Sequence, residues 1–171
     1  MRNKNKNRVF RFNRRIRGQT NYALRLKLLK SKMLRVVIRK SNSGINVQLV
    51  KYESSGDNVI VGARAMDLIK LNYTLNTGNI VASYLTGYLV AKKAKLKGIN
   101  EDCIVDLGLQ NAYYGSRLFA AVKGLMDGGL KVRVSEKVFP TEERLKGEHL
   151  KVKNVASVIE KTKKTIEAMK K

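Results

Sequence analysis

The chain has 171 residues, enough for one domain with extensions, and 43% of them are hydrophobic, which excludes an intrinsically disordered protein. Its net charge of +23 predicts a polyanionic partner. A single cysteine, Cys103, excludes an internal disulfide framework, and its apolar surroundings predict a buried, reduced thiol in a cytosolic protein.

The first predicted unit is a basic arm, residues 1–18. It has no sustained hydrophobic period and ends at Gly18, so we expect it to be mobile in the free protein. It also lacks the apolar segment of a secretory signal, and its lack of serines argues against an organellar transit peptide. We therefore expect a cytoplasmic location.

Positive charge continues beyond the arm. Residues 1–40 carry 15 of the 36 Lys and Arg residues and no acid, and the first carboxylate is Glu53. The remaining 131 residues carry 21 basic against 13 acidic side chains, a net charge of only +8. Because solvated surfaces usually mix both signs, this segment predicts contact with phosphate groups. Aromatic and hydrogen-bonding residues interrupt the charge, a mixture suited to unpaired bases and 2′-hydroxyls of RNA, namely Phe10, Phe12, Asn13, Gln19, Asn21 and Tyr22.

A helix is predicted next, with Thr20 as its N-cap. Its apolar stripe has helical spacing and consists of Tyr22, Leu26, Leu29 and Met33. Its first turn contains no acid, so the free backbone N–H groups there could receive a phosphate.

The hydrophobic period then changes from 3.6 to 2, which predicts strands. Leu34 to Arg39 and Ile45 to Val50 flank a turn at 41–44, and a second turn at 53–58 leads into a third strand at 59–65. Arg35 and Arg39 are expected on the face opposite the apolar side chains. That face is predicted to be wet or occupied by a partner.

The later elements alternate between helix and strand. Helices are predicted at about 78–97 and 115–126, a buried strand at 103–108, and a final strand at 130–134. Strands linked through helices imply parallel pairing, so the fold class is α/β with a mixed sheet. The apolar window 80–91 is too short and too polar for a membrane span.

C-terminal helices complete the predicted chain. A short helix follows Pro140 and Thr141, and an amphipathic helix begins near Asn154. We divide the chain into the basic arm (1–18), an α/β domain with its leading helix (19–140) and a C-terminal helical extension (141–171).

Catalytic and cofactor motifs are missing from the sequence. One His, one Cys and no paired acids at ligand spacing predict no metal, and no phosphate-binding glycine loop is present. His149 is interpreted as a surface residue, and Asp106 as a structural residue that binds nearby backbone. We expect no cofactor, no small-molecule substrate and no enzymatic activity.

Four stretches of sequence resemble a known family. They are NRRIRGQTNYALRLKLLKSK, LRVVIRKSN, DLGLQNAYYGSRLFAAVKGLMDGGLKV and FPTEERLKGEHL. In this order they are similar to the archaeal form of large-subunit ribosomal protein eighteen, the 5S rRNA-binding family equivalent to eukaryotic large-subunit protein five. The resemblance covers roughly residues 8–150. It implies a ribonuclease H-like fold without catalytic acids, of the type found in components of the translation machinery.

The resemblance also implies a function and a set of contacts. The family recruits 5S rRNA to the central protuberance, so the implied partners are 5S rRNA, large-subunit rRNA and neighbouring large-subunit proteins. This chain departs from the family pattern at Gln19 and Asn21, where Lys and Asp are common. Charge and resemblance together predict the RNA-binding residues Arg8, Arg11, Arg14, Arg15, Arg17, Gly18, Gln19, Thr20, Asn21, Tyr22, Arg25, Lys27, Lys30, Lys32, Arg35, Arg39 and Asn42.

Two alternatives to this function stay open at the level of sequence. One is a metal-dependent RNA nuclease on the same scaffold, for which Asp106 is the candidate carboxylate. The other is a general binder of polyanions or anionic membrane surfaces.

Overall fold

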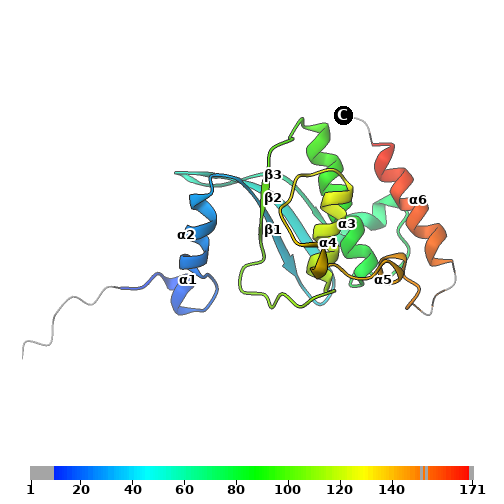
Figure 1. Cartoon of the computed structure of the whole chain (residues 1–171), viewed down its shortest axis with the longest axis horizontal. Helices are drawn as coiled ribbons and strands as arrows, with labels where there is room; N and C mark the ends of the chain where they lie inside the picture. The colour runs from blue at the N-terminus through cyan, green and yellow to red at the C-terminus, as the bar shows by residue number, and fades with distance from the viewer. Residues whose placement is uncertain (1–9, 151, 153, 170–171) are drawn as a thin grey trace, which may run out of the picture.

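A four-stranded mixed sheet lies at the centre of the computed structural model, which describes residues 10–150, 152 and 154–169. The strands are β1 (Leu34–Lys40), β2 (Ile45–Glu53), β3 (Gly56–Arg64) and β4 (Cys103–Asp106). Their order is β3-β2-β1-β4, with an antiparallel meander over β1 to β3 and β4 parallel to β1 (Figure 1). The predicted α/β class and its parallel pairing are confirmed.

Alternation along β1 separates two environments. Leu34, Val36 and Ile38 are buried in the core, whereas Arg35 and Arg39 extend from the opposite face, as predicted. Cys103 is buried at the start of β4, also as predicted, and its burial together with nearby acids raises the pKa of the thiol to about 11.

The first of the two predicted turns between strands is confirmed, and the second is shorter than predicted. The first turn forms as expected, because the Ser41 N–H donates to the Gly44 carbonyl at 2.8 Å. The second is tighter, since Glu53 pairs directly with Gly56. The third strand therefore starts at Gly56, three residues before the predicted range 59–65.

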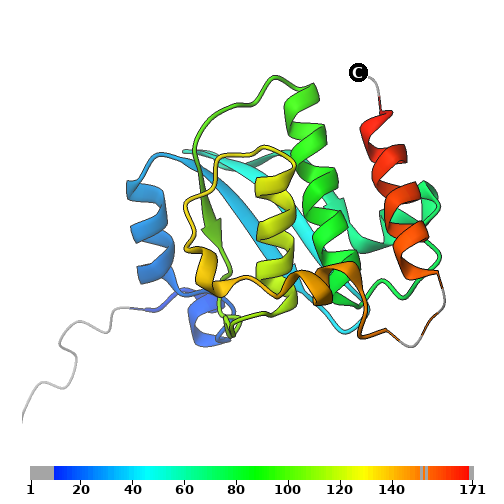
Figure 2. The same ribbon diagram turned by 45° about the vertical axis from the view of Figure 1, so that its right-hand side comes forward.

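Two helices cover the apolar face of the sheet, α3 (Ile80–Leu96) and α4 (Arg117–Asp127) (Figure 2). They approach closely through glycines. A Cβ at Gly87 would overlap the backbone of Ala121, and a Cβ at Gly124 would overlap the carbonyl oxygen of Tyr84. Within the described residues, no helix is both long enough and apolar enough to cross a membrane.

The predicted final strand at 130–134 is wrong. Only Val132 forms a bridge, to Cys103, and the Cys103 N–H donates to Lys131 at 2.8 Å. The segment leaves the sheet after this contact, because Arg133 turns outward to pair with Asp102 at 3.0 Å and a 3-10 turn follows.

The remaining elements surround the sheet and the two helices. Helices α1 (Asn13–Ile16) and α2 (Tyr22–Lys30) lie on one side, and η1 (Ala65–Leu71) and α6 (Val155–Glu167) lie on the other (Figures 1 and 2). The short elements η2 (Glu136–Val138) and α5 (Glu142–Lys146) come between α4 and α6 along the chain. As predicted, α6 is amphipathic, and it packs against α3 and η1 with Ile159 and Ile166 buried. Figure 1 places α2 and α6 at opposite sides of the molecule.

Lysines from α3 cover the outer edge of β3. Lys97 Nζ donates to the Ile60 carbonyl at 2.7 Å, and Lys93 Nζ lies 3.4 Å from the Gly62 carbonyl. These are carbonyl groups of an edge strand that has no strand partner on that side.

Candidate nucleic-acid interface

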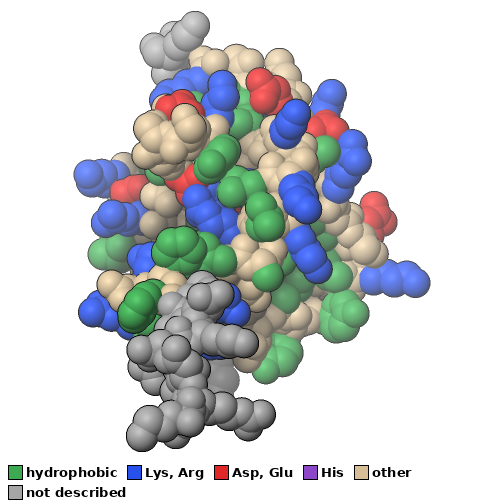
Figure 3. Space-filling view, turned by 90° about the vertical axis from the view of Figure 1, so that its left-hand side faces the viewer, with side chains coloured by type: hydrophobic (Ala, Val, Ile, Leu, Met, Phe, Trp, Pro, Cys, Tyr) green, Lys and Arg blue, Asp and Glu red, His purple; other side chains and the backbone are tan. Residues whose placement is uncertain are grey.

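The basic segment enters the described structure at residue 10 and forms α1 without burying any side chain. Arg11, Arg14, Arg15 and Arg17 are all exposed, whereas Arg8 lies outside the described residues. Viewed from this side, Lys and Arg side chains recur across the surface with hydrophobic side chains between them (Figure 3).

Two contacts shape the turn between α1 and α2. Arg14 Nε donates to Thr20 Oγ1 at 3.0 Å, and the rings of Phe12 and Tyr22 lie 4.9 Å apart. Gly18 supports the turn with a φ of +62°, a conformation that favours glycine. The turn therefore exposes Gln19 beside several guanidinium groups.

The N-cap of α2 is Asn21, so the prediction of Thr20 is wrong. The Asn21 side chain accepts from the Leu24 N–H at 3.1 Å, while the Thr20 hydroxyl is already bound to Arg14. The first turn of α2 contains no acid. Phosphate binding there remains a prediction.

The predicted apolar stripe of α2 is only partly covered. Tyr22, Leu29 and Met33 are half-buried, but Leu26 is 56% exposed, and no residue of the helix is buried. The predicted basic residues Lys27, Lys30 and Lys32 are exposed. The helix thus presents charge outward and has little apolar contact with the sheet.

Three arginines and two aspartates form an alternating network beneath α2. Its members are Arg25 in α2, Asp57 in β3, Arg35 and Arg39 in β1 and Asp106 in β4. Each carboxylate oxygen meets a different guanidinium nitrogen: Arg25–Asp57 at 2.9 Å, Asp57–Arg35 at 2.7 Å, Arg35–Asp106 at 3.2 Å and Asp106–Arg39 at 3.0 Å. We call these five residues the arginine–aspartate network; their formal charge is +1.

The electrostatics of Asp57 follow from its two partners. Partial burial raises the pKa of this carboxyl, but hydrogen bonds and charge from Arg35 and Arg25 outweigh that effect and hold the pKa below its usual 3.8. Asp57 is therefore an anion at physiological pH.

Arg35 does not reach the surface on which it was expected. Its side chain is 2% exposed and bridges Asp57 and Asp106. The sheet face that the sequence predicts to be wet or held by a partner is occupied at this point by the chain's own carboxylates. Arg35 therefore offers little surface to a partner on this face, and its contact with RNA stays a prediction.

Arg39 is held on several sides but keeps an open edge. Its Nη1 donates to the carbonyls of Ile38 and Asp106 at 2.8 and 2.6 Å, and its side chain is 42% exposed. Gly108 makes room for the Arg39 side chain, because a Cβ at this position would lie 2.9 Å from the guanidinium carbon. Asn42, also predicted to bind RNA, is exposed in the turn that follows β1.

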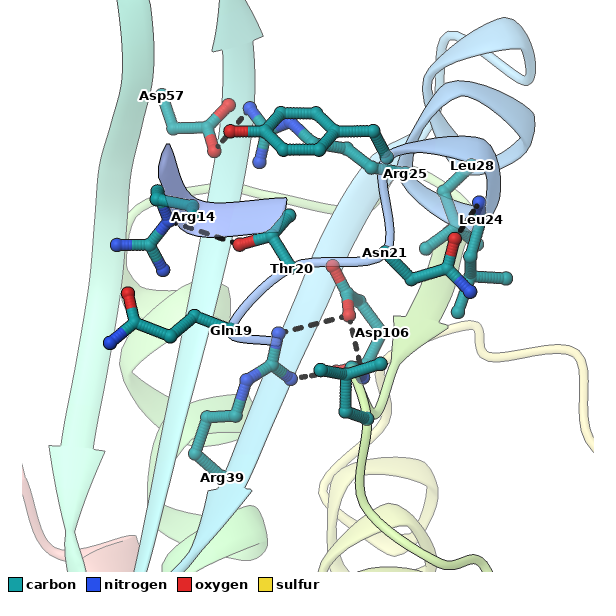
Figure 4. A pocket seen from close by; sticks show the side chains of 13 residues that line it. Arg14, Gln19, Thr20, Asn21, Leu24, Arg25, Leu28, Arg39, Asp57 and Asp106 are labelled. Atoms are coloured by element: carbon teal, nitrogen blue, oxygen red, sulfur yellow. Dashed lines mark hydrogen bonds and ion pairs between the residues drawn. The ribbon is translucent and has the colours of Figure 1, made fainter. Parts of the chain in front are cut away.

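A cleft of about 490 Å³ opens beside the network (Figure 4). Arg14 lines it from α1, Gln19 and Thr20 from the turn before α2, and Arg39 and Asp106 from the sheet. Six predicted RNA-binding residues from α1, the turn and α2 therefore converge with Arg39 on one cleft: Arg14, Gln19, Thr20, Asn21, Tyr22 and Arg25.

Sequence reasoning missed an exposed apolar loop next to this cleft. Leu109 lines the cleft and is 53% exposed, and Tyr113 and Tyr114 of the same loop are also exposed. In the sequence, this loop is marked by a pair of tyrosines between Gly108 and Gly115. In the structure, both glycines have φ near +65°.

The surroundings of Asp106 are unlike those of a metal-binding carboxylate. Its two oxygens face Arg35 and Arg39, and Oδ1 also accepts from the Gly108 N–H at 2.9 Å. The predicted structural role, bonding to nearby backbone, is confirmed. Over the described part of the chain, no three His, Cys, Asp or Glu residues gather closely enough to hold a metal ion.

Comparisons with known proteins identify relatives of this chain. The family model described as "Ribosomal large subunit proteins 60S L5, and 50S L18" matches residues 6–102. The large ribosomal subunit protein uL18 of Methanoregula boonei is 43% identical over 162 residues, covering 94% of this chain and 92% of its own. The uL18 proteins of Korarchaeum cryptofilum and Methanococcoides burtonii are 44% and 43% identical, covering 82% and 81% of this chain and 71% and 80% of their own.

The class defined by these findings is a structural, non-enzymatic protein of the large ribosomal subunit. More narrowly, the chain belongs to the uL18 family in its archaeal form, the family that includes the eukaryotic L5 proteins.

Proposed function

We propose that the chain binds 5S rRNA and helps attach it to large-subunit rRNA at the central protuberance, beside neighbouring large-subunit proteins. Family membership supports a ribosomal role, and the surface of α1 and α2 supports RNA as the direct partner. The alternatives, a nuclease and a general polyanion binder, differ from this function in measurable ways.

The observation that carries the proposal is the exposed positive charge around the cleft. Arg11, Arg15 and Arg17 are exposed, and none of the ion pairs between described residues involves them. Arginines without an acidic partner are free to meet phosphate oxygens. They belong to the same segment as Gln19 and Thr20, whose amide and hydroxyl groups can form hydrogen bonds with bases or 2′-hydroxyls.

Different parts of the segment have different roles in this proposal. Exposed Arg and Lys side chains of the arm and of α2 neutralise phosphates and set the affinity. Gln19, Asn21 and Tyr22, together with the apolar loop around Tyr113 and Tyr114, meet unpaired bases. The arm, residues 1–18, acts as a separate RNA-binding unit.

A titration with 5S rRNA tests the electrostatic core of the proposal. Displacement of counterions from roughly 6 to 10 phosphates should weaken binding by about 10³ to 10⁵ between 50 and 200 mM salt. A single-stranded polyuridylate of the same length is the control and should bind much more weakly at 200 mM. A flat salt response contradicts RNA binding through charge, and equal affinity for both RNAs favours a general polyanion binder.

Two double variants that each remove two charges locate the interface. Arg15→Gln with Arg17→Gln should lower 5S rRNA affinity by about ten- to a hundredfold at 150 mM salt. The matched control, Lys161→Gln with Lys164→Gln, removes two exposed charges from α6 at the other side of the molecule. Equal losses in both variants would show that only net charge matters.

Deletion of residues 1–18 tests the division between arm and domain. The part of the arm that the structure describes buries no side chain, so the midpoint of thermal unfolding should stay within a few degrees. Affinity for 5S rRNA should fall sharply. An unchanged affinity would assign binding to the sheet and α2 alone.

A further inference from the structure

We propose that Asp57 and Asp106 are positioning residues for RNA binding: these two acids hold α2 and Arg39 in their binding orientation before RNA arrives. The inference rests on the proposed binding of 5S rRNA and adds to it a role for negative charge. Both acids line the cleft, but each is bound to two guanidinium groups, so its negative charge is compensated where RNA is proposed to lie.

Helix α2 has few contacts with the rest of the protein. None of its residues is fully buried, and Leu24 and Leu26 are exposed. The Arg25–Asp57 pair, at 2.9 Å, is the one hydrogen bond or ion pair between α2 and the sheet among the described residues. A nine-residue helix is marginal in water without tertiary contacts, so α2 depends on this pair together with the contacts of its partly buried apolar side chains.

A buried arginine links the two acids of the arginine–aspartate network. Arg35, 2% exposed, joins Asp57 to Asp106 at 2.7 and 3.2 Å. Arg35 compensates the charge of both acids. It thereby links Asp57, which holds α2, to Asp106, which holds Arg39. A buried cation with two acidic partners is costly to disrupt, so the network keeps one geometry.

Two arginines of the network stay partly exposed to solvent. The side chains of Arg25 and Arg39 are 33% and 42% exposed, although each is bound to an acid. A guanidinium group has five N–H donors, so a group that binds one carboxylate keeps donors for a phosphate. The aspartates therefore orient the arginines without using up their capacity to bind RNA.

This arrangement predicts that removal of a negative charge weakens the binding of 5S rRNA. Removal of a carboxylate makes the protein more positive and should strengthen binding to any polyanion. If Asp57 positions α2, its loss should instead weaken specific binding, because RNA must then order the helix itself. The two effects have opposite directions and can be separated in one experiment.

The test compares Asp57→Asn with Glu160→Gln in the full-length protein. Both variants remove one negative charge, but Glu160 is exposed in α6, away from α2 (Figure 1), and takes part in none of the ion pairs between described residues. We expect Asp57→Asn to bind 5S rRNA about tenfold more weakly, as for the loss of preorganisation in one or two side chains. Its affinity for polyuridylate should be unchanged or higher. Glu160→Gln should stay within about twofold for both RNAs.

Two further measurements separate positioning from loss of structure. Asp57→Glu retains the charge and should recover most of the 5S rRNA affinity. Amide hydrogen exchange of the free Asp57→Asn protein should be faster in α2 and unchanged in α3 and α4. Arg35 keeps Asp106 as an acidic partner in this variant, so we expect the core to stay folded.

Several results would overturn the inference. They are a 5S rRNA affinity of Asp57→Asn that matches Glu160→Gln, an equal loss for both RNAs, or unaltered exchange in α2. Wild-type protein that binds polyuridylate as tightly as 5S rRNA contradicts the proposed function instead. Because exchange is measured without RNA, positioning of α2 by Asp57 is decided in that case too.

Discussion

The α3–α4 pair and the α1–α2 segment are both helical, but different forces hold them. The first pair is buried and packed through Gly87 and Gly124, whereas the second buries no side chain and is tied to the sheet by an ion pair. Close packing is insensitive to salt and pH, and ion pairs near the surface are not. The stable part of the molecule is therefore separate from the part proposed to meet RNA.

The largest expected change in the free energy of unfolding concerns the close contact between α3 and α4. A Cβ in Gly124→Ala overlaps the Tyr84 carbonyl oxygen, so α3 and α4 must separate, and the free energy of unfolding should fall by about 3 kcal/mol or more. Urea unfolding measures this change. Gly18→Ala is the matched control: no atom lies within 4 Å of its Cβ, and strain at φ +62° should cost about 1 kcal/mol locally. Similar losses in the free energy of unfolding for both variants would contradict the difference between the α3–α4 pair and the α1–α2 segment.

A pair of leucines sharpens the same comparison. Leu85 in α3 is fully buried, so Leu85→Ala should lower the free energy of unfolding by about 2 to 5 kcal/mol through lost contacts and a cavity. Leu26 in α2 is 56% exposed, so Leu26→Ala should stay within about 0.5 kcal/mol. If Leu26→Ala were as costly as Leu85→Ala, α2 would be part of the cooperative core.

The smallest effect concerns pH and is confined to α2. Because the pKa of Asp57 is lowered in the folded protein, its contribution is complete above the ordinary value of 3.8 and is lost as pH falls through the lower folded value. Acidification below pH 3.8 should therefore release α2 before the core unfolds. An NMR titration should show this in the α2 amides, and Asp57→Asn should show α2 already loosened at neutral pH. Simultaneous loss of α2 and core signals would contradict it.

Most of the sheet was predictable because alternation is a local signal. Leu34, Val36 and Ile38 alternate with Arg35 and Arg39, and burial follows that pattern. The prediction of a strand at 130–134 was wrong because an apolar run carries no information about whether a neighbouring strand is long enough to pair with it. With β4 only four residues long, one bridge is formed.

The candidate site was predictable in composition but not in pairing. The charge pattern identified Arg25, Arg35 and Arg39 as a group, yet Arg35 is buried and reaches Asp106, 71 residues further along the chain. Periodicity shows the face on which a side chain lies, and it carries no information about which distant side chain faces it. The choice of Asn21 over Thr20 as the cap has a similar origin, because both residues suit the position and a neighbouring arginine decides between them.

The lysines on the edge of β3 have a consequence for the protein outside the ribosome. Lys97 and Lys93 lie against the carbonyls of Ile60 and Gly62, the groups that a strand from another molecule would use for pairing. Such a strand would have to displace both ammonium groups and bury their charge, which makes β3 a poor template for aggregation. Pairing of another chain with this edge is therefore disfavoured.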